Sequence, residues 1–190
     1  MKFISITPRL RGKFLTAYDA VYETATGRRK TYDMTSRHPD LEQGADLHLR
    51  PAEAVILILR DESGERLLLE REFRMTANQK VFNFPAGLME PGEEAEQAAR
   101  RELREETGLE LTRVEAILPA GYNGLGVSNE KNIFLLGRAA GEIKPSDCDE
   151  EEIEAAWYDR EQVRSLLQKS PFESRTQLYC HIWAKGSCHI

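Results

Sequence analysis

The chain has 190 residues, of which 41% are hydrophobic and 31% are charged, and its formal net charge is −6. This length and composition suit one compact domain, or one domain with a small appendage, and leave ample apolar material for a core. The 26 basic residues are spread along an acidic sequence, which excludes the electrostatic footprint of a nucleic-acid-binding protein.

A β-hairpin is predicted close to the N-terminus. Residues 14–22 and 29–36 are rich in aromatic and β-branched side chains, and the Thr26-Gly27 pair between them is a turn signal. The polar residues that follow have the composition of a connector. We therefore expect residues 1–50 to form a small N-terminal β-sheet region ahead of a main domain at 51–190.

The main domain mixes strands with helices. Strong helix formers fill residues 93–107 and end at Gly108, which is a favourable residue for a helix C-terminus. Strands and helices do not alternate regularly, so we expect an α+β fold, with a mixed sheet covered by helices, and not a doubly wound one. Further helices are predicted at 159–168, with a capping-box pattern, and at 176–183, and strands at 52–60, 67–73, 83–88, 111–118, 133–137 and 155–158.

Neither a targeting segment nor a disulfide framework is predicted. The longest apolar run, residues 54–59, is too short to span a bilayer, and the start of the chain lacks a signal-peptide core. We therefore expect a cytoplasmic protein that binds no membrane. Cys148, Cys180 and Cys188 lack CxxC spacing, so they are expected to be thiols and not zinc ligands.

Two glutamates fall on what should be the apolar face of helix 93–107. At 100° per residue, Glu102 and Glu106 lie within about a 100° arc that also contains Ala95, Ala98 and Ala99. Like charges four residues apart repel each other, and a buried unpaired carboxylate is costly. This spacing therefore predicts that a positive group lies between them.

A hard divalent cation is the group that fits this pattern. Glu105 lies on the adjacent edge of the helix, so three carboxylates can converge on one ion. Donors that are all oxygen suit Mg²⁺ or Mn²⁺, which commonly bridge to substrate phosphates, whereas zinc prefers His or Cys. The alternative interpretation is a solvated acidic helix with pairs such as Arg101 with Glu105.

The residues around these carboxylates resemble the box that defines the Nudix hydrolase family. Gly87, five residues, Glu93, seven residues, Arg101-Glu102-Leu103, one residue, Glu105-Glu106, one residue and Gly108-Leu109 match every fixed position of G-x5-E-x7-R-E-U-x-E-E-x-G-U, where U is aliphatic. The resemblance implies a Nudix-type α/β/α sandwich over about residues 50–170 and hydrolysis of a nucleoside diphosphate linked to another moiety.

The same resemblance implies roles for the residues of the box. Glu102 and Glu106 are the principal metal ligands, Glu105 assists as ligand and catalytic residue, and the backbone carbonyl of Ala86 or Gly87 completes the shell. Glu93 pairs with Arg101 to hold the loop against the helix, and Gly108, like Gly87, has a structural role in the motif.

Segments outside the box resemble the ADP-ribose and ADP-sugar pyrophosphatase branch. Residues 72–74 and 84–87 are similar to that branch's "QFR" and "LPAG" segments, with glutamate and phenylalanine as the departures at Glu72 and Phe84. The resemblance implies that Arg74 binds substrate phosphates. Arg37, which follows residues 32–36, is a candidate to approach a phosphate or ribose from a neighbouring subunit. The resemblance also implies a homodimer in which the N-terminal sheet reaches over the partner.

The acidic run 149–152 resembles the loop that supplies the catalytic base in related pyrophosphatases. Glu151 is favoured as the base or as the residue that holds the attacking water, with Glu150 and Glu152 as alternatives; a solvated loop is the competing interpretation. Residues 128–130 resemble the branch's "S-D/T-E" segment, which implies a contribution from Glu130 to the metal or substrate site.

The sequence indicates the type of reaction but leaves more than one nucleotide sugar open as the substrate. The branch has a proline about fifteen residues after the box, whereas Pro119 lies ten residues after Leu109. A GDP-mannose or other nucleotide-sugar pyrophosphatase therefore stays open beside an ADP-ribose pyrophosphatase. A further alternative is a sensor on the same fold that binds a nucleotide sugar without cleaving it.

Overall fold

The structure is a computed structural model that describes residues 1–146 and 152–186. The chain divides into two compact units. Unit 1 contains residues 1–53 together with residues 120–132, and unit 2 contains residues 54–119 and 133–190. Each unit is described by itself below.

Unit 1 is built on a three-stranded antiparallel sheet in the order β1-β2-β3. The predicted hairpin is confirmed, because β2 (Thr16–Glu23) and β3 (Arg29–Ser36) pair along their whole length. The first strand, β1 (Lys2–Arg11), was not predicted. A short helix, α1 (Asp46–Leu49), lies in the segment that was expected to be a connector. The core of unit 1 consists of Ile6, Tyr18, Ala20 and Leu41.

Unit 2 contains the larger sheet, which is the mixed sheet expected for this fold. Five strands follow the order β11-β5-β4-β10-β8, with β6 paired to β5 and β7 paired to β4. A further short strand, β9 (Gly121–Tyr122), belongs to unit 1 and pairs with the first residues of β10. The bounds are β4 (Ala54–Arg60), β5 (Leu67–Arg74), β6 (Gln79–Asn83), β7 (Ala86–Leu88), β8 (Glu110–Ile117), β10 (Lys131–Ala140) and β11 (Ile153–Tyr158).

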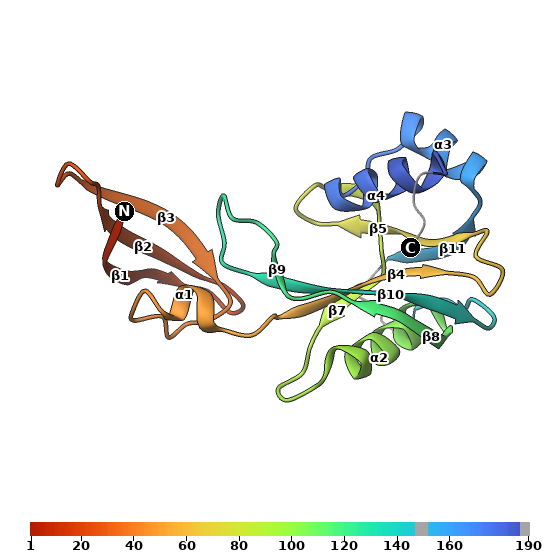
Figure 1. The fold of residues 1–190 in the computed structure, drawn as a ribbon, viewed down its shortest axis with the longest axis horizontal. Helices are drawn as coiled ribbons and strands as arrows, with labels where there is room; N and C mark the ends of the chain where they lie inside the picture. The colour runs from red at the N-terminus through yellow and green to blue at the C-terminus, as the bar shows by residue number, and fades with distance from the viewer. Residues whose placement is uncertain (147–151, 187–190) are drawn as a thin grey trace. The chain divides into compact units, whose positions relative to one another are not determined.

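Helices cover both faces of this sheet (Figure 1). Alternate residues of β4 point to opposite faces. Val55 and Leu57 pack with Leu103 of α2 (Ala95–Thr107) on one face. Ile56 and Ile58 pack with residues of α3 (Arg160–Lys169) and α4 (Ser174–Ala184) on the other face. The sheet is therefore buried on both sides, which explains why β4 reads as a continuous apolar run.

Local signals explain where the main helices begin and end. Asp159 and Gln162 form the predicted capping box of α3, since the Gln162 backbone N–H donates to Asp159 Oδ1 at 2.8 Å and the Asp159 backbone N–H donates to Gln162 Oε1 at 2.9 Å. Helix α2 ends at Gly108, which adopts a left-handed conformation with φ of 73°. Within the described ranges, no helix is long and apolar enough to cross a membrane.

The extended segment predicted at 83–88 is divided into two strands. Asn83 ends β6, Ala86 begins β7, and Pro85 lies between them. Because proline has no N–H to donate, the ladder is interrupted there, although the Pro85 carbonyl still accepts from the Leu57 backbone N–H at 2.8 Å. The interruption lets one segment pair first with β5 and then with β4. It also places Gly87 against the side chain of Glu102 in α2.

Candidate active site

A loop clamp holds the segment before α2 against the helix. Arg101 donates from Nε to Glu93 Oε1 at 3.1 Å and from Nη2 to Glu93 Oε2 at 2.9 Å, and Nη2 also donates to the Leu88 carbonyl at 2.9 Å. The hydrogen bonds from Arg101 lower the pKa of Glu93, and the same contact raises the pKa of Arg101. Both groups therefore stay charged, and the loop is fixed by a two-pronged ion pair.

The carboxylate of Glu102 occupies the space above the backbone of Gly87. A Cβ atom added to Gly87 would lie 1.8 Å from Cδ of Glu102 and 2.0 Å from its Oε1. No residue other than glycine leaves room for this approach. Only 14% of the Glu102 side chain is exposed, and Arg101 Nη1 donates to Glu102 Oε1 at 2.7 Å.

Glu106 is the second enclosed carboxylate of α2. It is 8% exposed and lies one helical turn after Glu102, on the side of α2 that carries the buried residues Ala99 and Leu103. Glu105 is different, because 55% of its side chain is exposed and its contact with Arg101 Nη1 is long, at 3.5 Å. Glu102 and Glu106 are therefore the pair with the least access to water.

These residues fit a divalent cation of the hard, oxygen-binding kind. In the described part of the chain, no three Asp, Glu, His or Cys side chains gather as a ready-made ion site. Mg²⁺ does not require one, because it commonly takes one or two carboxylates and completes its shell with water and substrate phosphate. Glu102 and Glu106 would supply the carboxylates, and the Glu102 carboxylate lies against the backbone of Gly87, where a carbonyl of Ala86 or Gly87 would complete the set.

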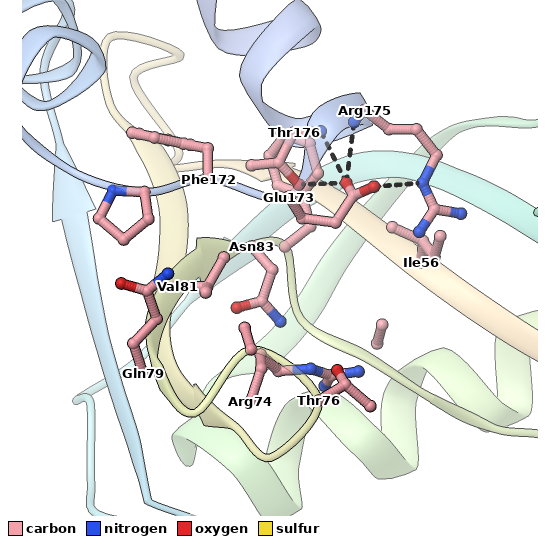
Figure 2. A pocket seen from close by; sticks show the side chains of 14 residues that line it. Ile56, Arg74, Thr76, Gln79, Val81, Asn83, Phe172, Glu173, Arg175 and Thr176 are labelled. Carbon is pink, nitrogen blue, oxygen red and sulfur yellow. Dashed lines mark hydrogen bonds and ion pairs between the residues drawn. The ribbon is translucent and has the colours of Figure 1, made fainter.

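A cavity of about 400 Å³ is lined by residues of β4, β5, β6 and β7 and of the first turn of α4, and it borders the core cluster that contains Ile56 and Phe84 (Figure 2). Its lining combines two guanidinium groups, two amides, the carboxylate of Glu173 and aromatic rings. The lining includes Arg74, Asn83, Phe84, Ala86, Phe172 and Arg175. The cavity and the residues that fit a metal ion share Ala86, the proposed carbonyl ligand, whereas no residue of α2 lines the cavity. Such a mixture of cationic and apolar groups suits a phosphorylated organic ligand.

Helix α4 starts at the rim of this cavity. Glu173 is its N-cap, and its Oε2 accepts from the backbone N–H groups of Arg175 at 3.0 Å and Thr176 at 2.9 Å. The Arg175 Nε donates to Glu173 Oε1 at 2.8 Å (Figure 2). The first turn of α4 is therefore fixed, and it holds the Arg175 side chain at the cavity wall.

Two predicted substrate residues lie together in unit 1. Arg37 Nε donates to Glu130 Oε1 at 2.9 Å, and Asn123 Nδ2 donates to Glu130 Oε2 at 3.0 Å. Both oxygens of Glu130 are thus engaged within unit 1. Of the candidate catalytic bases, Glu150 and Glu151 lie outside the described residues. Glu152 is 71% exposed and lies 3.6 Å from the Lys80 ammonium.

Three features of the site were not predicted from the sequence. Glu70 is buried, with 1% exposure, and it shares a face of β5 with Leu68, which packs against α2. Asn83 and Arg175 line the cavity. The signal for Glu70 was available, because a glutamate at an inward position of an apolar strand breaks the hydrophobic pattern; the cavity residues give no such local signal.

Comparisons with known proteins identify a family match and several relatives of this chain. Residues 50–178 match the profile of the NUDIX domain. The chain is 32% identical over 118 residues to "Nudix hydrolase 19, chloroplastic" of Arabidopsis thaliana. This match covers 60% of this chain and 26% of that protein. It is 29% identical over 182 residues to the "ADP-sugar pyrophosphatase" of Mus musculus, covering 92% of this chain and 81% of that protein.

A solved structure shares the fold. The crystal structure of an "ADP compounds hydrolase" superposes with a TM-score of 0.74 and 22% identity, covering 100% of this chain and 98% of that one. The chain spans only about a quarter of the length of the plant relative but most of the mouse relative.

Proposed function

Because this chain belongs to the Nudix family, we propose that it is a divalent-metal-dependent hydrolase of nucleoside diphosphate sugars, with ADP-ribose as the first candidate substrate. The products would be a nucleoside monophosphate and a sugar phosphate. One observation carries the proposal: Glu102 and Glu106 are enclosed on one side of α2, and the Glu102 carboxylate fills the space that the missing side chain of Gly87 leaves. The similarity to an ADP-sugar pyrophosphatase over 92% of the chain supports the substrate class.

The metal in this proposal is Mg²⁺ or Mn²⁺. Its bound charge would neutralise the diphosphate oxygens and favour attack by water. Glu102 and Glu106 hold it, and the pair of Glu93 with Arg101 keeps the carbonyl-bearing loop against the helix. Arg74, at the wall of the cavity, binds a phosphate oxygen of the substrate.

The proton of the attacking water needs an acceptor. We assign this role to Glu151, with Glu150 and Glu152 as the alternatives, on the resemblance of the acidic run to the related loop. A glutamate in that position acts as a general base when it reaches the water by a hydrogen bond. Replacement of each residue in turn, with turnover as the readout, identifies the base.

A second cavity has a lining that suits a nucleobase. It has a volume of about 250 Å³ and lies within unit 1, where Tyr22, Tyr32 and Tyr122 contribute to its wall. Asn129 also lines it and is 7% exposed, and its Oδ1 has no hydrogen-bond partner among residues 1–146 and 152–186. Aromatic rings stack on nucleobases, and an amide reads a base edge through its donor and acceptor.

The proposal includes a homodimer formed through unit 1. Leu10 is 69% exposed, Phe14 is 66% exposed and Leu15 is 47% exposed, and these residues belong to the segment that ends β1 and leads into β2. Large apolar side chains gathered on a surface mark interaction sites. A second copy of the chain would cover them.

Incubation with a substrate panel tests the proposed activity. The purified protein is incubated with Mg²⁺ or Mn²⁺ and with ADP-ribose, GDP-mannose, other nucleotide sugars and dinucleotides, and the products are identified by mass. Hydrolysis of ADP-ribose to AMP and ribose phosphate is expected. Oxygen-18 water reports which phosphorus is attacked. Preference for GDP-mannose would change the substrate, and binding without cleavage of any compound would make the protein a sensor.

A further inference from the structure

Arg74 is anchored by a carboxylate from its own strand. Glu72 and Arg74 lie two residues apart on β5, so their side chains leave the same face of the strand. Nη1 of Arg74 donates to both oxygens of Glu72, at 2.8 Å each. Asn83 on the paired strand β6 donates from Nδ2 to Glu72 Oε2 at 2.9 Å. The position of the Arg74 guanidinium is therefore determined by Glu72, and that of Glu72 by Asn83.

Burial indicates which member of the pair is the anchor. The Glu72 side chain is 15% exposed, whereas the Arg74 side chain is 54% exposed. An enclosed carboxylate requires donors on its oxygens to stay charged at low cost, and Arg74 and Asn83 provide them. Because the enclosed group has the less freedom to move, Glu72 orients Arg74 and not the reverse.

This contact uses only one end of the guanidinium. Within the part of the chain that the structure describes, Nε and Nη2 of Arg74 have no hydrogen-bond partner. Arg74 also lines the same cavity as Ala86, the proposed carbonyl ligand. The N–H groups that Glu72 does not use are therefore available for an oxyanion in that cavity, and a planar pair of donors suits a phosphate.

We propose that Glu72 is a positioning residue, which holds Arg74 so that its remaining N–H groups meet a phosphate of the substrate. The inference rests on the proposed function, because the phosphate in question belongs to the nucleoside diphosphate. Glu72 replaces the glutamine of the related branch. A glutamine offers one neutral acceptor in place of two charged oxygens, so it can still hold Arg74 but less firmly.

A double-mutant cycle between Glu72 and Arg74 tests the inference. The variants are Glu72→Ala, Glu72→Gln, Arg74→Ala and the double variant Glu72→Ala with Arg74→Ala. Glu154→Ala is the matched control, because Glu154 is an exposed β11 carboxylate that also pairs with basic groups, Arg71 and Lys80, at the surface. Thermal unfolding of each variant establishes that it is folded.

Glu72→Ala is expected to lower kcat/KM about tenfold, the loss of one charge-assisted contact. Glu72→Gln is expected to recover most of this loss, and Glu154→Ala to leave kcat/KM unchanged. In the Arg74→Ala background, removal of Glu72 should have no further effect. An equal loss in both backgrounds would mean that Glu72 acts through the fold alone, and full activity in Glu72→Ala would remove its role entirely; either result overturns the inference.

Calorimetric binding of AMP, in the presence of Mg²⁺, separates this inference from the proposed function. Absence of hydrolysis by the unmodified protein would reject the proposed function. The same cycle measured on AMP affinity would still decide the role of Glu72, because a phosphate binds to Arg74 whether or not it is cleaved. Coupling between the two residues in AMP affinity is expected, and additive losses contradict the inference.

Discussion

Glu102 and Gly87 share one volume of space: the carboxylate of Glu102 lies where a side chain on Gly87 would begin, with Cδ 1.8 Å from the position of that absent Cβ. Gly87 is on β7, where it pairs with Val55, so the surrounding backbone is fixed by the sheet. The atoms that would have to move are at the end of a flexible side chain. Glycine at position 87 is therefore needed to leave space for the Glu102 carboxylate, and the fold itself does not depend on it.

Gly87→Ala is therefore expected to fold and to lose metal affinity. The added methyl group displaces the Glu102 carboxylate, and the displaced oxygens no longer face the Ala86–Gly87 backbone. Calorimetric titration with Mn²⁺ measures the loss, for which we expect on the order of tenfold or more. Gly121→Ala is the control, since a Cβ there meets nothing within 4 Å. Unchanged Mn²⁺ affinity in Gly87→Ala would show that Glu102 binds no ion.

Glu106→Gln is expected to remove most turnover while the protein stays folded. The change deletes the charge of one metal ligand. Mutation of residues that only hydrogen-bond to metal ligands already lowers metal affinity or activity by about 10–100-fold, so we expect kcat to fall at least about a hundredfold. Thermal unfolding of the variant establishes that it is folded. Glu105→Gln, at an exposed position, should have a smaller effect. Full activity of Glu106→Gln contradicts the metal assignment.

Glu173 is expected to stabilise α4 in a pH-dependent way. Burial alone would raise the pKa of Glu173, but the backbone N–H groups of Thr176 and Arg175 and the Arg175 side chain outweigh it and lower the pKa below its ordinary value of 4.5. A carboxyl whose pKa is lower in the folded state stabilises that state above the unfolded pKa and loses this effect as the pH falls through the folded pKa.

Glu173→Ala should therefore reduce the free energy of unfolding by about 1 kcal/mol at pH 7, the usual cost of losing an N-cap. The difference from the unmodified protein should shrink as the pH is lowered below 4.5, the ordinary pKa of this glutamate. Urea unfolding at a series of pH values measures both. A difference that persists unchanged at the lowest pH at which the protein folds would exclude the carboxylate as its source.

Substitution of Leu10 and Phe14 by Asp is expected to weaken the proposed dimer. Both side chains are largely exposed, so the changes should leave the fold of the isolated chain intact. Light scattering after gel filtration measures the mass. The unmodified protein should elute with twice the mass of the chain and the double variant as a monomer. Leu178→Asp, at an exposed position of α4, is the control. A monomeric unmodified protein contradicts the proposal.

The sequence predicted best those elements whose signals are local. The hairpin of β2 and β3, helix α2 and the capping box of α3 all follow from periodicity and cap residues within a few positions. The strand β1 was missed, because Pro8 and several exposed polar residues hide its pattern; its pairing with β2 shifts register beside that proline. Pro85 likewise divides one expected strand into β6 and β7.

In the candidate site too, contacts within one segment could be predicted from the sequence, whereas contacts between segments could not. The Nudix box places Glu93 and Arg101 at a fixed spacing along one segment, so their ion pair could be anticipated. The contact between Glu72 and Asn83 could not, because it depends on the register of β5 against β6, in which Glu72 is opposite Val81. The cavity beside Arg74 also depends on how the start of α4 packs against β6 and β7, and no single segment of the sequence determines that packing.

The guanidinium of Arg101 reaches Glu93, Glu102 and Glu105 at once. It acts as an internal counter-ion for the carboxylate that we assign to the metal. Loading the protein with a dication is thus an exchange of one positive partner for another at Glu102, and a chelator does not leave that carboxylate bare. The protein stripped by dialysis against a chelator should therefore keep its native circular dichroism and take up metal again.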